Sequence, residues 1–305
     1  MKKLEKEIIR DIKRLKKSRR AVILAHNYQL PEVQEIADYC GDSLELSRIA
    51  AKTKARIVVF CGVHFMAETA SILCPDKKIL MPDTSAGCPM ADMITGRQLR
   101  SLKHRHPQAT VVGYVNTSAE VKAELDICCT SANAVAVVNA LKDKKEIIFV
   151  PDRNLADFVS RRTGKRLIAW EGFCPIHVKI LPEDIKRSKR FHPRACVIVH
   201  PECSPEVIAL SSAALSTSQM SKFTKSNKAK EFIIGTEAGL IYKLKKDNPS
   251  KEFYPATEMA VCADMKRTTI GGVLRALEEL KYEIRVSDKI RRRARMAIER
   301  MIQIL

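Results

Sequence analysis

The chain has 305 residues, 46% hydrophobic and 29% charged, a balance that excludes a disordered or fibrous protein. A chain of this length folds as two or three units of roughly 100 residues. Its formal net charge of +19 favours anionic partners, either phosphate backbones or small acidic substrates. Ten cysteines without a secretion signal favour a reducing, cytoplasmic compartment, where thiols bind metals, catalyse reactions or fill cores.

The first 20 residues predict a charged amphipathic helix rather than a targeting segment. Apolar residues recur there at helical spacing, at Leu4, Ile8, Ile12 and Leu15. This stretch lacks the apolar centre of a signal peptide, and no uncharged run approaches the roughly 18 to 20 residues that span a bilayer. We therefore expect neither export nor a membrane segment.

Three apolar runs, which begin at Ala21, Ala109 and Ala195, each predict a buried strand ending in polar residues. Ala109 lies 88 residues after Ala21, and Ala195 lies 86 residues after Ala109. The same two offsets carry His26 onto Tyr114 and His200, Tyr28 onto Asn116 and Glu202, and Ser43 onto Ser131 and Thr217. Matches without gaps at a fixed period indicate an internal repeat.

The repeat continues through a second strand, an amphipathic helix and a third strand in each copy, and each third strand leads to one cysteine. These cysteines are Cys88, Cys174 and Cys262. Strands that alternate with helices at this spacing predict βαβ crossovers and parallel sheets. We expect an α/β fold of three pseudo-threefold-related, three-layer αβα units around a central site. The expected ranges are 1–88, 89–174 and 175–262, followed by a C-terminal helical segment, 263–305.

In open parallel sheets, ligands bind beyond the carboxyl ends of the strands, where the three cysteines would converge. Three thiolates without a fourth protein ligand suit a 4Fe-4S cluster whose open iron acts as a Lewis acid. The alternative is that they are small buried residues, as we expect for Cys40, Cys61, Cys74 and Cys196. A zinc site is less favoured because the sequence lacks paired cysteines at C-x2-C spacing. The adjacent Cys128 and Cys129 are expected to pack in a core.

Polar side chains at the ends of the first strands form a second ring of candidates: His26, Tyr28, Tyr114, Asn116, His200 and Glu202. Taken singly, such residues are often ordinary loop residues. Together they offer donors for carboxylates, one general base and a phenol that can relay a proton. Ser43, Ser131 and Thr217 could bind an anion at helix starts or could be ordinary N-caps. His177 either lies near the same centre or caps the following helix.

Seven short motifs, in order and with all three cysteines in place, resemble the quinolinate synthase family over essentially the whole chain. The motifs are HNYQ, DSLELS, YVNT, HPEC, STS, GTEAG and CADMK. The sequence departs from the family pattern at Leu215, where glycine is usual, and at Asp264, where asparagine is commoner. Neither departure touches a proposed cluster ligand.

The resemblance implies a transferase of NAD biosynthesis with a 4Fe-4S cluster on Cys88, Cys174 and Cys262. Members of the family condense iminoaspartate with dihydroxyacetone phosphate and release quinolinate, phosphate and water. The substrate-binding residues implied by position are His26, Ser43, Tyr114, Asn116, Ser131, His200, Glu202 and Thr217. Glu202, Tyr28 and His200 would be catalytic, with Glu202 and Tyr28 moving protons.

The resemblance also implies a functional link to an L-aspartate oxidase or aspartate dehydrogenase, which would supply iminoaspartate. Two other interpretations stay open. One is a different 4Fe-4S hydro-lyase that acts on a small carboxylate. The other is a basic nucleic-acid-binding iron-sulfur protein, which is disfavoured because aromatic residues make up only 5% of the chain and no RNA-binding motif occurs.

Overall fold

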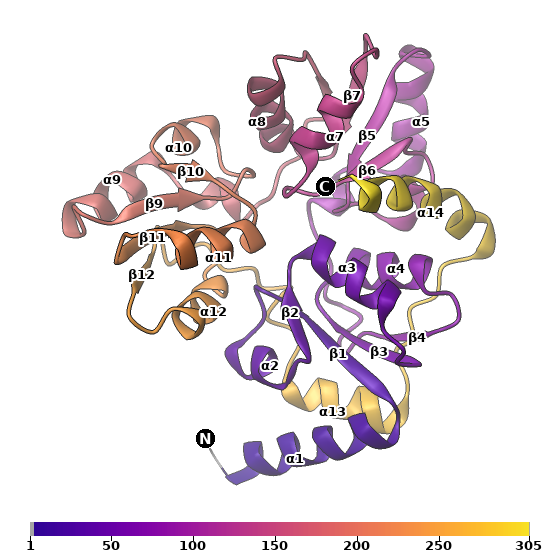
Figure 1. The fold of residues 1–305 in the computed structure, drawn as a ribbon. Helices are drawn as coiled ribbons and strands as arrows, with labels where there is room; N and C mark the ends of the chain where they lie inside the picture. Colours follow the sequence, from indigo (N-terminus) through magenta and orange to yellow (C-terminus); the bar gives the residue numbers. More distant parts are fainter. Residues whose placement is uncertain (1–2, 305) are drawn as a thin grey trace.

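The fold consists of three similar α/β units whose four-stranded sheets are arranged around a common centre (Figure 1). The computed structural model describes residues 3–304, so the terminal positions of the expected ranges, Met1, Lys2 and Leu305, lie outside the described residues. Strand pairs within the sheets are parallel, as βαβ crossovers require. The predicted α/β class with three αβα units is confirmed.

The first unit begins with the expected N-terminal helix and continues with alternating strands and helices. Its elements are α1 (Lys3–Ser18), β1 (Ala21–His26), α2 (Pro31–Ile36), β2 (Tyr39–Gly41), α3 (Ser43–Lys52), β3 (Ile57–Cys61), α4 (His64–Leu73) and β4 (Lys78–Leu80). Strands β1 and β3 are apolar runs that are buried almost throughout, as expected for central strands. Helix α3 starts where the Asp42 carboxylate accepts hydrogen bonds from the N–H groups of Leu44 and Glu45.

The second unit repeats this order after a short 3-10 turn. Its elements are η1 (Ala91–Met93), α5 (Gly96–Arg105), β5 (Thr110–Tyr114), α6 (Ala119–Lys122), β6 (Ile127–Cys129), α7 (Ala134–Ala140), β7 (Ile147–Val150), α8 (Arg153–Thr163) and β8 (Ile168–Ala169). A capping box between Thr95 and Gln98 starts α5, and α8 ends at Gly164, whose φ is +70°.

The third unit follows the same plan and leads into two C-terminal helices. Its elements are η2 (His177–Lys179), α9 (Pro182–Phe191), β9 (Cys196–Val199), α10 (Pro205–Ala209), β10 (Ala213–Ala214), α11 (Thr217–Ser226), β11 (Glu231–Gly235), α12 (Leu240–Asp247) and β12 (Glu252–Pro255), followed by α13 (Ile270–Glu279) and α14 (Asp288–Gln303). Pro182 at the first position of α9 and the capping box of Ser216 and Gln219 in α11 set these helix starts.

The three sheets share one strand order, β2-β1-β3-β4, β6-β5-β7-β8 and β10-β9-β11-β12. The sequence predicted three strands in each unit, but each sheet has a fourth, short edge strand: β2, β6 or β10. These edge strands have only two or three residues, too few to produce a periodic pattern. They begin at Tyr39, Ile127 and Ala213, which are 88 and 86 residues apart, so they obey the predicted repeat.

The C-terminal helices are packed onto the first two units. Helix α13 packs against α1 and α2, whereas α14 packs against α4 of the first unit and α6 and β6 of the second. The buried Glu124 carboxylate pairs with Arg293 of α14 at 2.9 Å and with Arg100 of α5 at 2.8 Å. Helix α14 therefore contacts both the first and the second unit. The division of the chain into four ranges stays a prediction.

The cysteines predicted to pack in cores divide into two groups. Cys61, Cys74, Cys128 and Cys129 are buried, in agreement with the expectation. The prediction is wrong for Cys40 and Cys196, which are only half-buried, because Cys40 lies on the edge strand β2 and Cys196 is the first residue of β9. Among residues 3–304, no helix combines the length and apolar character needed to cross a membrane.

Replacing Ile298 by alanine tests the docking of α14, since this side chain is fully buried. The cavity left behind should lower the free energy of unfolding by about 2 to 5 kcal/mol in urea denaturation. Met296 lies on the same helix but is 54% exposed, so Met296→Ala should change that free energy by less than about 0.5 kcal/mol. Equal effects of the two substitutions would contradict the docking.

Candidate functional site

A cavity of about 200 Å³ lies where the strand ends and cysteine loops of the three units meet. All twelve residues predicted for the site line it. They are His26, Tyr28, Ser43, Cys88, Tyr114, Asn116, Ser131, Cys174, His200, Glu202, Thr217 and Cys262. The repeat therefore brings equivalent residues of the three units to one place.

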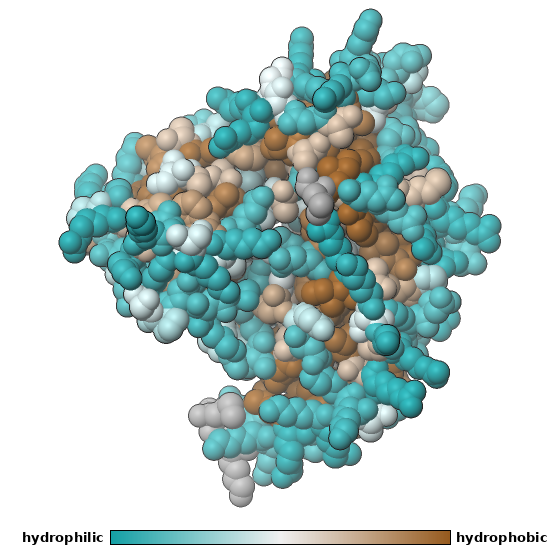
Figure 2. Space-filling view, in the orientation of Figure 1, coloured by the Kyte–Doolittle hydropathy of each residue, from teal (hydrophilic) through white to brown (hydrophobic). Residues whose placement is uncertain are grey.

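Hydrophilic side chains cover most of the face shown in Figure 2, with apolar groups exposed in patches between them.

Each cysteine at the cavity opens a helical turn. The N–H group four residues later donates to the cysteine carbonyl, at 3.2 Å for Cys88, 3.2 Å for Cys174 and 3.3 Å for Cys262. The sulfur atoms accept hydrogen bonds from the N–H groups two and three residues later: Met90 and Ala91, Ile176 and His177, and Asp264 and Met265. Such donors stabilise a thiolate, and their repetition gives the three sulfur atoms the same environment.

Burial opposes ionisation of these thiols. It raises the pKa of Cys88 to about 12 and raises the pKa of Cys174 and Cys262 as well, although the N–H donors act in the opposite direction. A metal centre that binds the sulfur atoms would replace the protons. Three half-buried thiols with N–H donors around one cavity fit an iron-sulfur cluster, whose ligands are thiolates tuned by hydrogen bonds.

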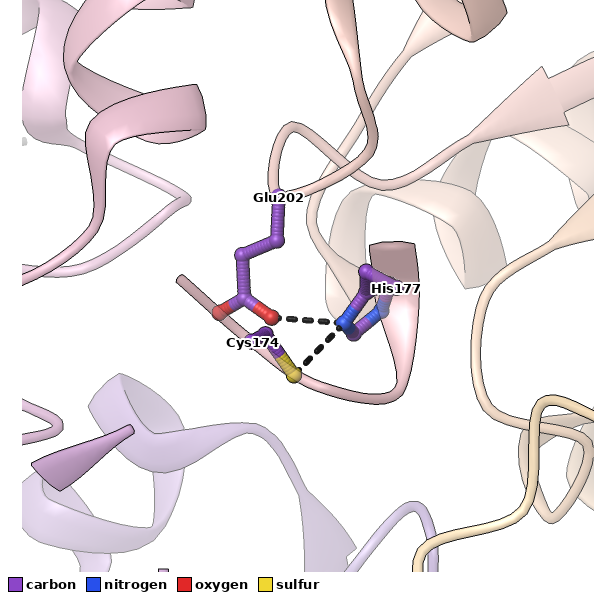
Figure 3. Close-up of side chains that lie close together, drawn as sticks. All are labelled: Cys174, His177 and Glu202. Carbon is purple, nitrogen blue, oxygen red and sulfur yellow. Dashed lines mark hydrogen bonds and ion pairs between the residues drawn. The ribbon is translucent and has the colours of Figure 1, made fainter. Parts of the chain in front are cut away.

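One group at the cavity is compact enough to suggest a single metal ion. The ligand atoms of Cys174, His177 and Glu202 lie within 4.8 Å of one another (Figure 3). However, His177 Nδ1 lies 2.7 Å from Glu202 Oε2 and 3.1 Å from Cys174 Sγ, which are hydrogen-bonding distances. Two ligands of a tetrahedral ion at about 2.0 Å would lie roughly 3.3 Å apart. The geometry favours a hydrogen-bonded triad. Among residues 3–304, the three cavity cysteines do not form such a compact group.

The sequence allowed two roles for His177, and the structure places this residue inside the site. It is 2% exposed and begins the short turn η2, directly after the Cys174 loop. The N-cap of the following helix α9 is Leu181, so the capping alternative for His177 is wrong. The spacing of three residues from Cys174 was the available signal, because one helical turn brings the two side chains to one face.

Glu202 is the centre of the polar network. Its Oε1 atom accepts a hydrogen bond from the Tyr114 hydroxyl at 2.6 Å, and its Oε2 atom lies 2.7 Å from His177 Nδ1. Burial disfavours the carboxylate, but His177 and His200 together with these donors outweigh it and hold the pKa of Glu202 below its ordinary value. Glu202 is therefore an ionised, acceptor-only group.

The two histidines at the ends of β1 and β9 have equivalent surroundings. His26 Nδ1 accepts a hydrogen bond from the Tyr28 N–H at 3.2 Å, and His200 Nδ1 accepts one from the Glu202 N–H at 3.3 Å. Burial lowers the pKa of both histidines to about 3, so both rings are neutral near pH 7. Each ring then carries its proton on Nε2 and acts as a donor there. His200 Nε2 lies 3.1 Å from the Ser131 hydroxyl.

The two tyrosines of the cavity have different partners. Burial raises the pKa of Tyr28 and Tyr114 well above the ordinary value, so both are neutral phenols. Tyr114 donates directly to Glu202, whereas the Tyr28 hydroxyl lies 2.6 Å from Thr236 Oγ1. The sequence paired Glu202 with Tyr28, but the structure places Tyr114 against the carboxylate.

The hydroxyl residues near the helix starts are not capping residues. The N-caps of α3, α7 and α11 are Asp42, Asn133 and Ser216, whereas Ser43 and Thr217 each begin a helix and Ser131 precedes one. The N-cap interpretation of Ser43, Ser131 and Thr217 is therefore wrong.

Asn116 has an unsatisfied acceptor beside these hydroxyl groups. Its Oδ1 atom is buried and has no hydrogen-bond partner within the described part of the chain. A buried carbonyl without a donor is costly, so a donor on a bound molecule would stabilise this position.

Sequence reasoning missed Glu237 and Lys266. Glu237 is fully buried, accepts a hydrogen bond from the Cys262 N–H at 3.1 Å and pairs with Lys266 at 2.8 Å. Lys266 also donates to the Tyr28 carbonyl. Glu237 lies in the motif GTEAG and Lys266 in the motif CADMK, which in the sequence indicated only the family resemblance. Glu237 follows β11 by two residues, as Tyr28 follows β1, so the strand-end argument could have found it.

The structure accommodates both departures from the family pattern. Positive φ angles at residues other than glycine occur, within residues 3–304, at Arg20, Leu280 and Tyr282. Leu215 therefore needs no glycine conformation. Asp264 accepts a hydrogen bond from the Gly87 N–H at 3.2 Å, and this contact joins the loops of Cys88 and Cys262.

Comparisons with known proteins identify the family of the chain. The family model described as "Quinolinate synthetase A protein" matches residues 10–303. The chain is 55% identical over 294 residues to a quinolinate synthase of Dehalococcoides mccartyi (strain CBDB1), covering 96% of this chain and 97% of that relative. It is 54% identical over 298 residues to a quinolinate synthase of Thermodesulfovibrio yellowstonii, and the match covers 97% of this chain and 98% of that relative. A quinolinate synthase of Methanoregula boonei is 52% identical to this chain over 294 residues, and the match covers 96% of this chain and 97% of that relative. The chain belongs to the quinolinate synthetase A family.

Proposed function

We propose that the chain is a transferase that condenses iminoaspartate with dihydroxyacetone phosphate to give quinolinate, phosphate and water in NAD biosynthesis. The observation that carries this proposal is the single cavity in which three equivalent cysteines face the Glu202 network. Membership of the family and the name quinolinate synthase carried by its relatives support the formation of quinolinate.

Cys88, Cys174 and Cys262 would hold a 4Fe-4S cluster. When bound, such a cluster supplies a Lewis-acidic iron that assists the loss of water. The chain contributes the backbone N–H groups after each cysteine, which stabilise the three thiolates. The Glu237 carboxylate holds the Cys262 loop through the Cys262 N–H.

Neutral donors would bind the anionic substrates. The Nε2 protons of His26 and His200 and the hydroxyl groups of Ser43, Ser131 and Thr217 suit carboxylate and phosphate oxygens. Lys179 is exposed and also lines the cavity, where it adds a positive charge. Holding both substrates in one enclosed site converts their encounter into a reaction within one complex.

Glu202 and Tyr114 would move protons during the condensation. Because Tyr114 Oη is 2.6 Å from Glu202 Oε1, the carboxylate can take the phenolic proton as the phenol takes one from the substrate. His177 fixes the second oxygen of Glu202, so the carboxylate is held in one orientation.

The supply of iminoaspartate by an L-aspartate oxidase or an aspartate dehydrogenase stays a prediction, as does the cytoplasmic location. Iminoaspartate carries two carboxylates, which donors such as His26, His200 and Ser131 at the cavity would bind. The net charge of +19 would favour the approach of both anionic substrates.

Replacing Cys88, Cys174 or Cys262 by serine should remove the cluster. Anaerobically purified protein should contain about four irons per chain and form quinolinate, and each substitution should abolish both. The measurement is iron and sulfide content together with a quinolinate assay. Cys196→Ser is the control because this half-buried thiol begins β9, at the end of the strand away from the cavity. Iron retained in any of the three variants, or lost in the control, would contradict the ligand assignment.

Replacing Glu202 by glutamine should abolish the proton transfers but leave the cluster ligands in place. We expect quinolinate turnover to fall by about 10²- to 10⁴-fold, with unchanged iron content. Glu206→Gln is a matched control, because this exposed carboxylate lies only four residues away, on α10. Near-normal turnover of the Glu202 variant would show that another group moves the proton.

A further inference from the structure

Lys266 closes the helical turn that Cys262 opens, and its side chain returns to the same loop. Its N–H donates to the Cys262 carbonyl at 3.3 Å, and its Nζ atom lies 2.8 Å from Glu237 Oε1. The same oxygen accepts the Cys262 N–H at 3.1 Å, and Oε2 accepts the Gly239 N–H at 2.8 Å. Cys262 and Lys266, the two ends of the turn, are therefore held at one carboxylate.

The Glu237 carboxylate depends on this lysine. Glu237 is fully buried, and within residues 3–304 Lys266 is the only cation that forms an ion pair with it. A buried carboxylate that loses its cation keeps an uncompensated charge, which is strongly destabilising. Removing Lys266 should therefore disturb the carboxylate that holds the Cys262 loop.

The repeat shows that a cysteine turn of this kind does not need the lysine. The residue four positions after the cysteine is Asp92 in the first unit and Val178 in the second. Both turns close with the same hydrogen bond to the cysteine carbonyl, at 3.2 Å in each. The lysine is therefore a feature of the third unit, and its own contacts must explain it.

The other partner of Lys266 belongs to the first unit. Its Nζ atom donates to the carbonyl of Tyr28, which lies 238 residues away in the chain, in the turn after β1. The side chains of His26 and Tyr28 line the cavity from this turn. One ammonium group thus joins a cysteine turn of the third unit to a turn of the first unit at the same cavity.

Gly239 leaves the space that the ammonium group requires. A Cβ atom on this residue would lie 2.6 Å from Lys266 Nζ, 2.7 Å from the Tyr28 carbonyl oxygen and 2.8 Å from Glu237 Oε2. The φ of Gly239 is −61°, so its backbone conformation does not require glycine. The close approach of the three groups is what excludes a side chain, and the site is shaped for the head of the lysine.

We propose that Lys266 is a positioning residue that joins the Cys262 turn to the Tyr28 turn, with Glu237 and Gly239 forming the site that holds its ammonium group. This link sets the third unit against the first at the cavity, so that Cys262 and Tyr28 keep a fixed arrangement. The roles of Cys262 as a cluster ligand and of Tyr28 at the substrate rest on the proposed function, whereas the link between the two turns does not.

Amide hydrogen exchange of the anaerobically purified full chain, resolved by mass spectrometry, tests the link without any assay of turnover. Lys266→Met removes the ammonium group from the buried carboxylate and from the Tyr28 carbonyl. Exchange should become at least about tenfold faster in both turns, in peptides that contain residues 28–30 and 261–266. Unchanged exchange in either turn would overturn the proposal.

Gly239→Ala is a second variant that keeps both charged residues. Its methyl group would take the place of the ammonium group, so both turns should again exchange faster. Gly271→Ala on α13 is the matched control, because a Cβ there would meet Thr269 Oγ1 at an ordinary contact distance of 3.8 Å, and exchange should stay unchanged. A Gly239 variant with wild-type exchange would overturn the proposed site for the ammonium group.

Cys262→Ser separates the link from the cluster. This variant loses a proposed cluster ligand but keeps the backbone N–H at residue 262 and the pair of Glu237 and Lys266. The Tyr28 turn should therefore exchange as in the wild type. If it exchanged as fast as in the Lys266→Met variant, the cluster and not the lysine would hold this turn, and the proposal would be wrong.

Glu237→Gln in the Lys266→Met background separates the charge from the link, and it serves also if the single variant does not fold. The amide oxygen of glutamine still accepts the Cys262 N–H, and no charge stays buried. Exchange in the Cys262 turn should return to within about threefold of the wild type, whereas the Tyr28 turn should stay fast. Recovery of both turns would contradict a link through the Tyr28 carbonyl.

Failure of this inference is distinguishable from failure of the proposed function. If the wild-type protein held no iron or formed no quinolinate, the proposed function would fail. The exchange rates of the two turns would still decide whether Lys266 joins them, because they are measured on the chain itself.

Discussion

The site depends on one local geometry that the chain repeats three times. In each unit, a cysteine follows the last strand and begins a helical turn. Its sulfur atom accepts hydrogen bonds from two backbone N–H groups of that turn. Backbone donors are fixed by the turn itself, so they need no special side chain. The three sheets share one strand order and surround a common centre (Figure 1), and the three cysteines line the same cavity there. The symmetry of the site thus follows from the symmetry of the fold.

The asymmetry of the cavity comes from single side chains at equivalent positions. Glu202 occupies the place held by Tyr28 in the first unit and Asn116 in the second. A buried carboxylate without partners would be strongly unfavourable, and donors from Tyr114 and His177 compensate its burial. The network that stabilises this charge also orients it. Under the proposed function, the Glu202 carboxylate would move protons, whereas neutral donors such as His26 and His200 would bind the substrates.

Much of this arrangement could be predicted because the repeat places equivalent residues in three copies, so that a weak pattern in one copy is supported by the other two. A lone cysteine such as Cys88 says little, but three at matched offsets indicated a shared centre, and all three line one cavity. The short edge strands could not be found, since two or three residues such as Ala213–Ala214 carry no periodicity. The pairing of Glu202 with Tyr114 rather than Tyr28 was also beyond the sequence, because it depends on how the units are set against one another.

The contacts of the Thr236 hydroxyl with Tyr28 and His177 illustrate the same limit. The motif GTEAG was visible, but a hydroxyl that joins Tyr28 to His177 is defined only by contacts across segments more than 50 residues apart. Sequence spacing reports which residues share a strand end, whereas hydrogen-bond partners depend on side-chain directions. The strand-end argument could have placed Glu237 at the cavity, but its hydrogen bond with the Cys262 N–H could not be predicted from spacing.

The most direct test of the central claim is the iron anomalous signal from crystals of the anaerobically purified protein. We expect a compact cluster of iron atoms bonded to Cys88, Cys174 and Cys262. A single ion on Cys174, His177 and Glu202, with the other two cysteines free, would contradict it.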